Sequence, residues 1–144
     1  MTIADLNELY HIVKEITRDE RKIEEYRERA SSTTTNLSPD RGGETGPSDK
    51  IGNYASLIVD LEKETRRNRD RLLKKELELT QFINSIEVSE IRRACKARFV
   101  DCYKETADGK IIEWRPSWTK VARLVRSASG DSIRTRVADY LRTH

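Results

Sequence analysis

Two stretches of the chain place apolar residues at alternating intervals of three and four positions. The first runs from Ile3 to Ala30 and the second from Ile51 to Ile86. This spacing is typical of a helix that packs along a partner helix, and a helix of this length reaches roughly 40 Å. We therefore expect long helices over residues 3–30 and 51–86. Their seam positions are Leu6, Leu9, Val13, Ile16, Glu20, Ile23, Arg27 and Ala30, followed by Ile51, Tyr54, Ile58, Leu61, Thr65, Asn68, Leu72, Lys75, Leu79, Phe82 and Ile86.

The segment between these helices, residues 31–50, reads SSTTTNLSPDRGGETGPSDK, and Leu37 is its single apolar residue. Such a composition cannot bury enough apolar surface to offset the entropy lost on ordering, so it predicts a flexible connector. The connector would let the second helix fold back antiparallel to the first. Because both seams contain polar or charged members, two alternatives stay open: the seams close within one chain, or they pair across two chains in a homodimer.

A third helix of about four turns is predicted over EIRRACKARFVDCYKE, with Ser89 as its N-cap. Asp108, Gly109 and Pro116 then interrupt the helical pattern, and GKIIEW predicts an extended turn or a short hairpin arm. Cys95 and Cys102 lie seven residues apart, which fits neither an intrahelical disulfide nor a CxxC metal site. We expect both cysteines to be small buried residues.

The last part of the chain predicts two helices joined by a tight turn. Ser117 precedes WTKVARLV, and RSAS then leads into a final helix from Gly130 to about Arg142, with Ser129 as its N-cap. A short helix, a turn and a longer helix that begins with small polar and basic residues is a helix-turn-helix arrangement, whose second helix enters the DNA major groove. The predicted core of this unit is Trp118, Val121, Ala122, Val125, Ile133, Val137 and Leu141.

The outward positions of these two helices are candidates for DNA contacts. Arginine is suited to the O6 and N7 atoms of guanine, whereas contacts to phosphates set affinity and its salt dependence. An alternative is that the two helices only cap a helical bundle and that their arginines are solvated. The predicted base-reading residues are Asp131, Ser132, Arg134, Thr135 and Arg136, and the predicted backbone-contacting residues are Lys120, Arg123, Arg126, Ser127, Ser129 and Arg142.

The composition supports a helical fold of this kind. Hydrophobic residues make up 35% of the 144 residues and charged residues 37%, which is lean for a broad core but suits helices that bury one stripe. We expect an all-α protein, with a long helical hairpin or coiled coil over residues 1–88 and a helix-turn-helix bundle over residues 89–144. The formal net charge is +3, and the second of these parts contains 13 Lys and Arg against 7 Asp and Glu, a surplus that suits a nucleic-acid partner.

Other chemistries find little support in the sequence. No P-loop, dinucleotide-binding or HExxH motif occurs, and the two histidines, His11 and His144, lie in different regions. We therefore expect no enzyme activity, no cofactor and no metal site. The chain has neither a run of 18 apolar residues nor the apolar core of a signal peptide, which predicts a cytosolic protein without a membrane partner.

The order of segments along most of the chain carries a resemblance to a known family, and two segments match most sharply. GPSDKIGNYASLIVDLE (Gly46 to Glu62) and SWTKVA (Ser117 to Ala122) resemble the small phage-encoded regulators of the RinA and ArpU type. The resemblance implies a C-terminal helix-turn-helix similar to region four of bacterial sigma factors. It also implies transcriptional control of phage or prophage late genes for packaging or lysis, by binding double-stranded DNA and acting with bacterial RNA polymerase. The chain departs from the family's pattern in its longer segment 106–116 and in RSAS, which lacks the common glycine.

Two further functions remain as alternatives. One is a phage terminase small subunit, which also combines a helix-turn-helix with helical oligomerisation segments but usually places the DNA-binding part first. The other is a coiled-coil interaction protein whose basic C-terminal part is incidental.

Overall fold

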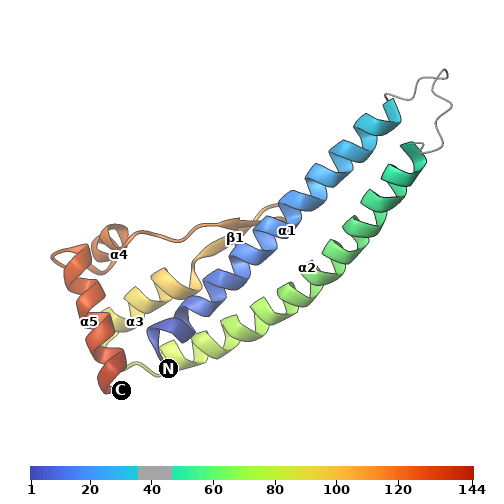
Figure 1. The fold of residues 1–144 in the computed structure, drawn as a ribbon. Coiled ribbons are helices and arrows are strands. Elements are labelled where there is room, and N and C mark those ends of the chain that lie inside the picture. Colours follow the sequence, from blue (N-terminus) through green and yellow to red (C-terminus); the bar gives the residue numbers. More distant parts are fainter. Residues whose placement is uncertain (36–46) are drawn as a thin grey trace.

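The long helical hairpin is the main feature of the fold. The computed structural model describes the backbone of residues 1–35 and 47–144 and the side chains of residues 1–32 and 52–144. Helices α1 (Ile3–Thr35) and α2 (Pro47–Asn84) run antiparallel side by side, as predicted (Figure 1). Both continue into the expected connector, since residues 31–35 and 47–50 are helical; its remaining residues, 36–46, lie outside the described part. Serine and threonine extend an established helix at small cost, because nucleation is the costly step.

The seam of the hairpin closes within the chain. Leu6, Leu9 and Val13 of α1 are fully buried, as is Leu79 of α2. The polar members are accommodated in two ways: Thr65 and Asn68 are buried, while the charged members pair across the two helices. These cross-helix ion pairs are Glu8 with Lys75 at 2.7 Å, Glu20 with Arg69 at 2.6 Å and Arg27 with Glu62 at 2.8 Å. A homodimer stays a prediction.

The third helix is shorter than predicted. Helix α3 (Ser89–Cys95) continues as a π-helical turn, η1 (Lys96–Val100), in which the N–H of Asp101 donates to the carbonyl of Lys96 at 2.9 Å. The predicted N-cap is wrong by one residue, because Val88 occupies that position with extended backbone and Ser89 is already helical. The wider turn brings the consecutive Phe99 and Val100 to buried positions before the helix ends.

A two-stranded antiparallel sheet follows, which makes the expectation of an all-α protein incomplete. Strand β1 (Tyr103–Glu105), predicted as helix, pairs with β2 (Ile111–Glu113), and Lys104 lies opposite Ile112. The hairpin arm predicted for GKIIEW is thus confirmed. Its turn uses Gly109 at φ 83°, a left-handed conformation that glycine adopts without steric cost. The helical prediction for β1 failed because strand pairing depends on residues further along the chain.

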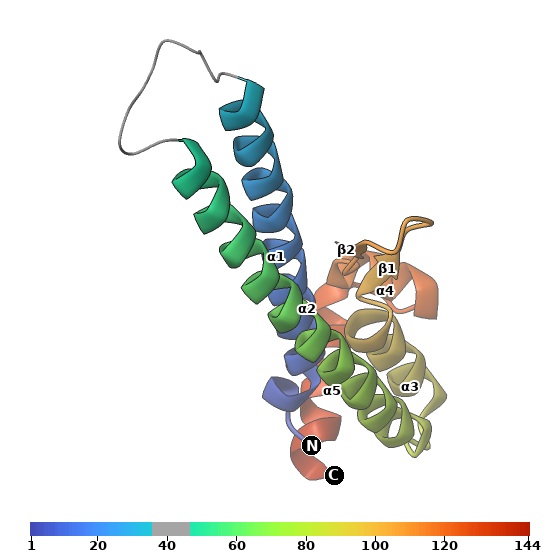
Figure 2. The ribbon, with the colours of Figure 1, turned by 90° about the vertical axis from the view of Figure 1, so that its right-hand side faces the viewer.

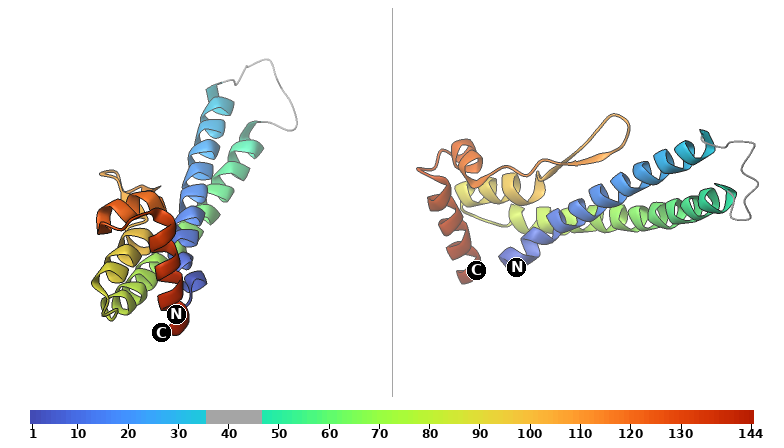
Figure 3. Two further views of the ribbon diagram at one scale, coloured as in Figure 1. Left: turned by 90° about the vertical axis from the view of Figure 1, so that its left-hand side faces the viewer. Right: turned by 45° about the horizontal axis from the view of Figure 1, so that its top comes forward.

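Helices α4 (Trp118–Val125) and α5 (Gly130–Thr143) complete the chain at the end of the hairpin where α1 begins and α2 ends. The views in Figures 2 and 3 place α5 across this end, with the two chain termini close together. One hydrophobic cluster includes Leu6 of α1, Ile83 of α2, Phe99 of η1 and Ile133 of α5. The core therefore continues across residue 88 and fixes the orientation of α4 and α5 relative to the hairpin.

Candidate nucleic-acid interface

The start of each C-terminal helix is fixed by a serine side chain. The hydroxyl of Ser117 accepts a hydrogen bond from the N–H of Lys120 at 3.2 Å, and that of Ser129 accepts one from the N–H of Ser132 at 3.1 Å. Each bond satisfies an N–H that has no partner inside the helix. Both predicted N-caps are confirmed, so these helix starts follow from local sequence.

The turn between the helices forms without glycine. Arg126 adopts the left-handed conformation at φ 58° and ψ 39°, and the N–H of Ser127 donates to the carbonyl of Ala122 at 2.8 Å. A residue with a Cβ atom in this conformation costs roughly 1 kcal/mol, which explains why glycine is usual at such positions. The chain thus keeps a tight turn and carries an exposed arginine at its bend.

Gly130 allows the two helices to approach closely. A Cβ atom at this position would lie 2.8 Å from the backbone nitrogen of Thr119 and 2.9 Å from the carbonyl carbon of Trp118. The first residue of α5 therefore packs directly against the start of α4. The sequence marked Gly130 only as the start of a helix, because nothing local to it reveals this distant contact.

The predicted core of the α4–α5 unit is buried almost throughout. Val121, Ile133 and Val137 are fully buried, and Ala122, Val125 and Leu141 are nearly so. Trp118 is half-buried and meets the ring of Phe99 edge to face, with 6.0 Å between the ring centroids. These contacts hold the unit against α3 and η1, leaving the opposite face of α5 in solvent.

The predicted base-reading residues occupy three sides of α5. At 100° per residue, Asp131 and Thr135 lie opposite the buried Ile133 and Val137, so they point away from the core. Arg134 lies on one flank of this outward stripe, and Ser132 and Arg136 on the other. Arg136 forms an ion pair with Glu90 of α3 at 2.5 Å. The structure thus leaves Asp131, Arg134, Thr135 and Arg136 exposed but does not gather them on one stripe.

The residues predicted to contact the DNA backbone differ in their exposure and in whether they form ion pairs or hydrogen bonds within the protein. Lys120, Arg123 and Arg126 are exposed, and among the described residues none of the three forms an ion pair. Arg142 pairs with Asp139 of its own helix, and the hydroxyl of Ser129 is used in capping. Ser127 is half-buried in the turn. Of these six predicted residues, the cations without an ion pair in the described part of the chain therefore lie on α4 and at the turn.

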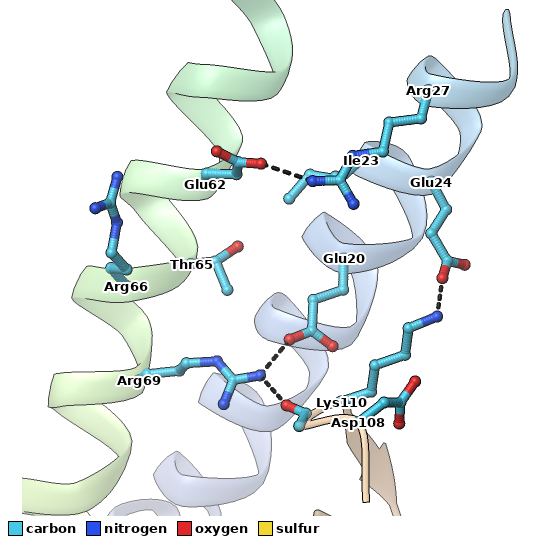
Figure 4. A pocket seen from close by; sticks show the side chains of 11 residues that line it. Glu20, Ile23, Glu24, Arg27, Glu62, Thr65, Arg66, Arg69, Asp108 and Lys110 are labelled. Atoms are coloured by element: carbon cyan, nitrogen blue, oxygen red, sulfur yellow. Dashed lines mark hydrogen bonds and ion pairs between the residues drawn. The ribbon is translucent and has the colours of Figure 1, made fainter. Parts of the chain in front are cut away.

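Away from the α4–α5 unit, a cavity of about 430 Å³ lies between α1, α2 and the turn of the β-hairpin. Figure 4 shows Arg69 of α2 reaching both Glu20, at 2.6 Å, and the carbonyl of Gly109, at 2.5 Å. Lys110 of the β-hairpin also forms an ion pair with Glu24 of α1. These charges are paired with each other, so the arrangement ties the β-hairpin to the long helices. This is a structural role for the 106–116 segment.

The remaining chemistry of the described residues is limited. Cys95 and Cys102 are buried free thiols, as expected, and burial raises their pKa to about 12 and about 11. Within the described ranges, no cluster of three or more His, Cys, Asp or Glu side chains is arranged to hold a metal ion. None of the helices in that part of the chain combines the length and apolar character needed to cross a membrane.

Comparison with protein-family models, with curated proteins and with solved structures gives no match to this chain. The resemblance to the RinA and ArpU type of regulator therefore rests on the sequence pattern alone.

Proposed function

We propose that this protein is a sequence-specific DNA-binding transcription regulator that uses α4 and α5 as a helix-turn-helix. The observation that carries the proposal is the exposed outer side of α5 together with three exposed cations of α4 and the turn that form no ion pair with any described residue, Lys120, Arg123 and Arg126. Unpaired cations keep their field in solution and attract DNA phosphates, and a helix of this kind fits the major groove.

Sequence choice would come from α5. Thr135 at the centre of the outward stripe can contact a thymine methyl group or accept a hydrogen bond, and Asp131 can accept one from the amino group of cytosine. Arg134 on the flank can reach guanine. The role as an activator of phage or prophage late genes that acts with bacterial RNA polymerase is proposed from the resemblance alone.

The salt dependence of DNA binding tests this assignment. The duplex is selected from a random pool with the wild-type protein, and affinity is then measured by fluorescence anisotropy at several salt concentrations. Replacing Lys120, Arg123 and Arg126 together by glutamine should flatten the plot of log K against log salt by about 0.9 for each phosphate that the variant no longer neutralises. The matched control replaces Arg21, Lys22 and Lys74, exposed hairpin cations, and should leave the slope unchanged. Equal slopes in the two triple variants would contradict the proposal.

Base reading is tested on the same duplex. We expect Arg134→Ala to weaken binding to the selected sequence by about 1 to 3 kcal/mol. The ratio of the affinity for the selected duplex to the affinity for random DNA should also fall. If the protein instead forms a large ring and binds duplexes with little sequence preference, the terminase small subunit is the better assignment. If it binds no duplex at low salt, the coiled-coil interaction protein is favoured.

A further inference from the structure

A cavity of about 320 Å³ opens where the start of α1, η1, the start of α4 and the flank of α5 meet. Three arginines line it: Arg98 of η1, Arg115 just before α4 and Arg134 of α5. Asn7, Phe99 and Trp118 are among the other lining residues. No Asp or Glu of the described chain contributes to this wall, so the cavity holds three positive charges without a matching negative one.

The hydrogen bonds of Arg98 and Arg115 do not neutralise these charges. Arg98 donates from Nη1 to the carbonyl of Pro116 at 2.5 Å, and Arg115 donates from Nη2 to Oδ1 of Asn7, so both acceptors are neutral. The Nε–H groups of both arginines are buried, and neither has a hydrogen-bond partner in the described structure. A buried donor left unpaired destabilises the fold, so the chain itself does not fully satisfy either arginine.

Aromatic rings hold the two guanidinium groups in place. Arg98 lies 5.1 Å from the ring centroid of Trp118, and Arg115 lies 4.5 Å from that of Tyr10. Burial lowers the pKa of both arginines, and the positive charge of Arg115 lowers the pKa of Arg98 further. The nearby Glu113 forms no ion pair with Arg115; its carboxylate accepts hydrogen bonds from Tyr10 and Thr17. The repulsion between the two cations is therefore left for another group to relieve.

We propose that this cavity binds a phosphate group. A tetrahedral oxyanion offers several acceptor oxygens and up to two negative charges, and arginine presents its donors in a planar fork that matches such oxygens. A carboxylate has two acceptor oxygens and can pair with the planar donor set of one guanidinium group. Three arginines around one cavity therefore match a phosphate better. The group belongs either to a free phosphorylated compound or to the backbone of bound DNA. The site itself does not depend on the proposed DNA-binding function.

Calorimetric titration of the full chain with inorganic phosphate tests the site, in chloride buffers of constant ionic strength. We expect saturable binding of one phosphate per chain, weakened by about tenfold or more in Arg115→Gln, because this variant lacks a charge-assisted hydrogen bond to the anion. Arg98→Lys keeps the charge but not the fork and should also weaken binding. Arg93→Gln, the same charge change at an exposed position on α3, should match the wild type. Circular dichroism confirms that each variant is folded.

Absence of saturable binding, or equal affinity in Arg115→Gln and Arg93→Gln, would overturn the proposal. The source of the phosphate group is distinguished by competition with the selected duplex. A DNA phosphate in the cavity predicts that inorganic phosphate displaces the duplex more strongly than chloride of equal ionic strength, and that Arg115→Gln weakens both ligands. A free phosphorylated compound predicts that phosphate and DNA bind together. If the protein binds no DNA, the phosphate titration still decides the site.

Discussion

The hairpin of α1 and α2 and the α4–α5 unit both carry many charges, but the cations at the hairpin seam and those on α4 and its turn differ in how they are paired. In the hairpin, cations near the seam meet carboxylates of the opposite helix. On α4 and at the turn, exposed cations have no such partner among the described residues, and the same holds for Arg134. The paired set is Lys75, Arg69 and Arg27 with Glu8, Glu20 and Glu62, and the unpaired set is Lys120, Arg123, Arg126 and Arg134.

This difference says more about function than net charge does. A paired cation contributes to holding two elements together, and its field at a distance is reduced by the partner's charge. An unpaired cation contributes little to folding and keeps its attraction for phosphates. The formal net charge of +3 averages over both sets, so it hides the difference between cations that hold two elements together and cations that stay available to a ligand.

The first prediction asks whether the two regions are also separate in folding. Ile133→Ala removes a fully buried side chain from the α4–α5 unit and should lower the free energy of unfolding by about 2 to 5 kcal/mol. Because one hydrophobic cluster joins both regions, we expect them to unfold together. Both tryptophans, Trp114 and Trp118, lie in the C-terminal part, so their fluorescence reports on it, while circular dichroism at 222 nm is dominated by the hairpin.

Coincident denaturation curves from the two signals would confirm this coupling. A fluorescence transition that moves in Ile133→Ala while the dichroism transition stays in place would show two independent units. The matched control is Leu124→Ala on α4, since Leu124 is 58% exposed and its truncation should change stability by less than about 0.5 kcal/mol.

The second prediction compares a glycine-to-alanine substitution in each of the two regions. The two variants should change protein stability in opposite directions. Gly130→Ala should destabilise the protein by about 1 to 3 kcal/mol, because its methyl group would collide with the backbone of Thr119. A methyl group at Gly52 of α2 meets no described atom within 4 Å, so Gly52→Ala should stabilise the helix by about 0.5 to 1 kcal/mol. Thermal unfolding of both variants measures the difference. A stabilising effect of Gly130→Ala would mean that α4 and α5 are not in close contact in solution.

Sequence rules predicted the α4–α5 unit well because its determinants are local. The caps at Ser117 and Ser129 and the apolar stripe through Ile133 and Val137 each depend on residues within a few positions. The same rules failed at Tyr103–Glu105, where an apparent helical stripe is overridden by pairing with a strand further along the chain.

Contacts between distant residues account for most of what sequence did not predict. Arg98 and Arg115 line one cavity with Arg134, although each of them belongs to a different element of the fold. Arg69 bonds to the carbonyl of Gly109, forty residues away. Neither arrangement has a short-range signal, and both depend on how the β-hairpin is placed against α1. The candidate DNA-facing residues were predictable, whereas their ion pairs and the arginine cavity required the structure.

The last prediction compares arginines of the paired and unpaired sets directly. Arg69→Met should lower the free energy of unfolding by about 1 to 2 kcal/mol, because it removes the ion pair with Oε1 of the partly buried Glu20 and the donor to the carbonyl of Gly109. Arg67→Met removes an exposed pair with Glu64 and should cost less than about 0.5 kcal/mol. Arg123→Met, in the unpaired set, should be similarly neutral for stability while weakening DNA binding. Urea denaturation of the three variants measures these values. If Arg123→Met destabilises the protein as much as Arg69→Met does, Arg123 contributes to the fold. The contrast between the paired and unpaired cations would then be lost.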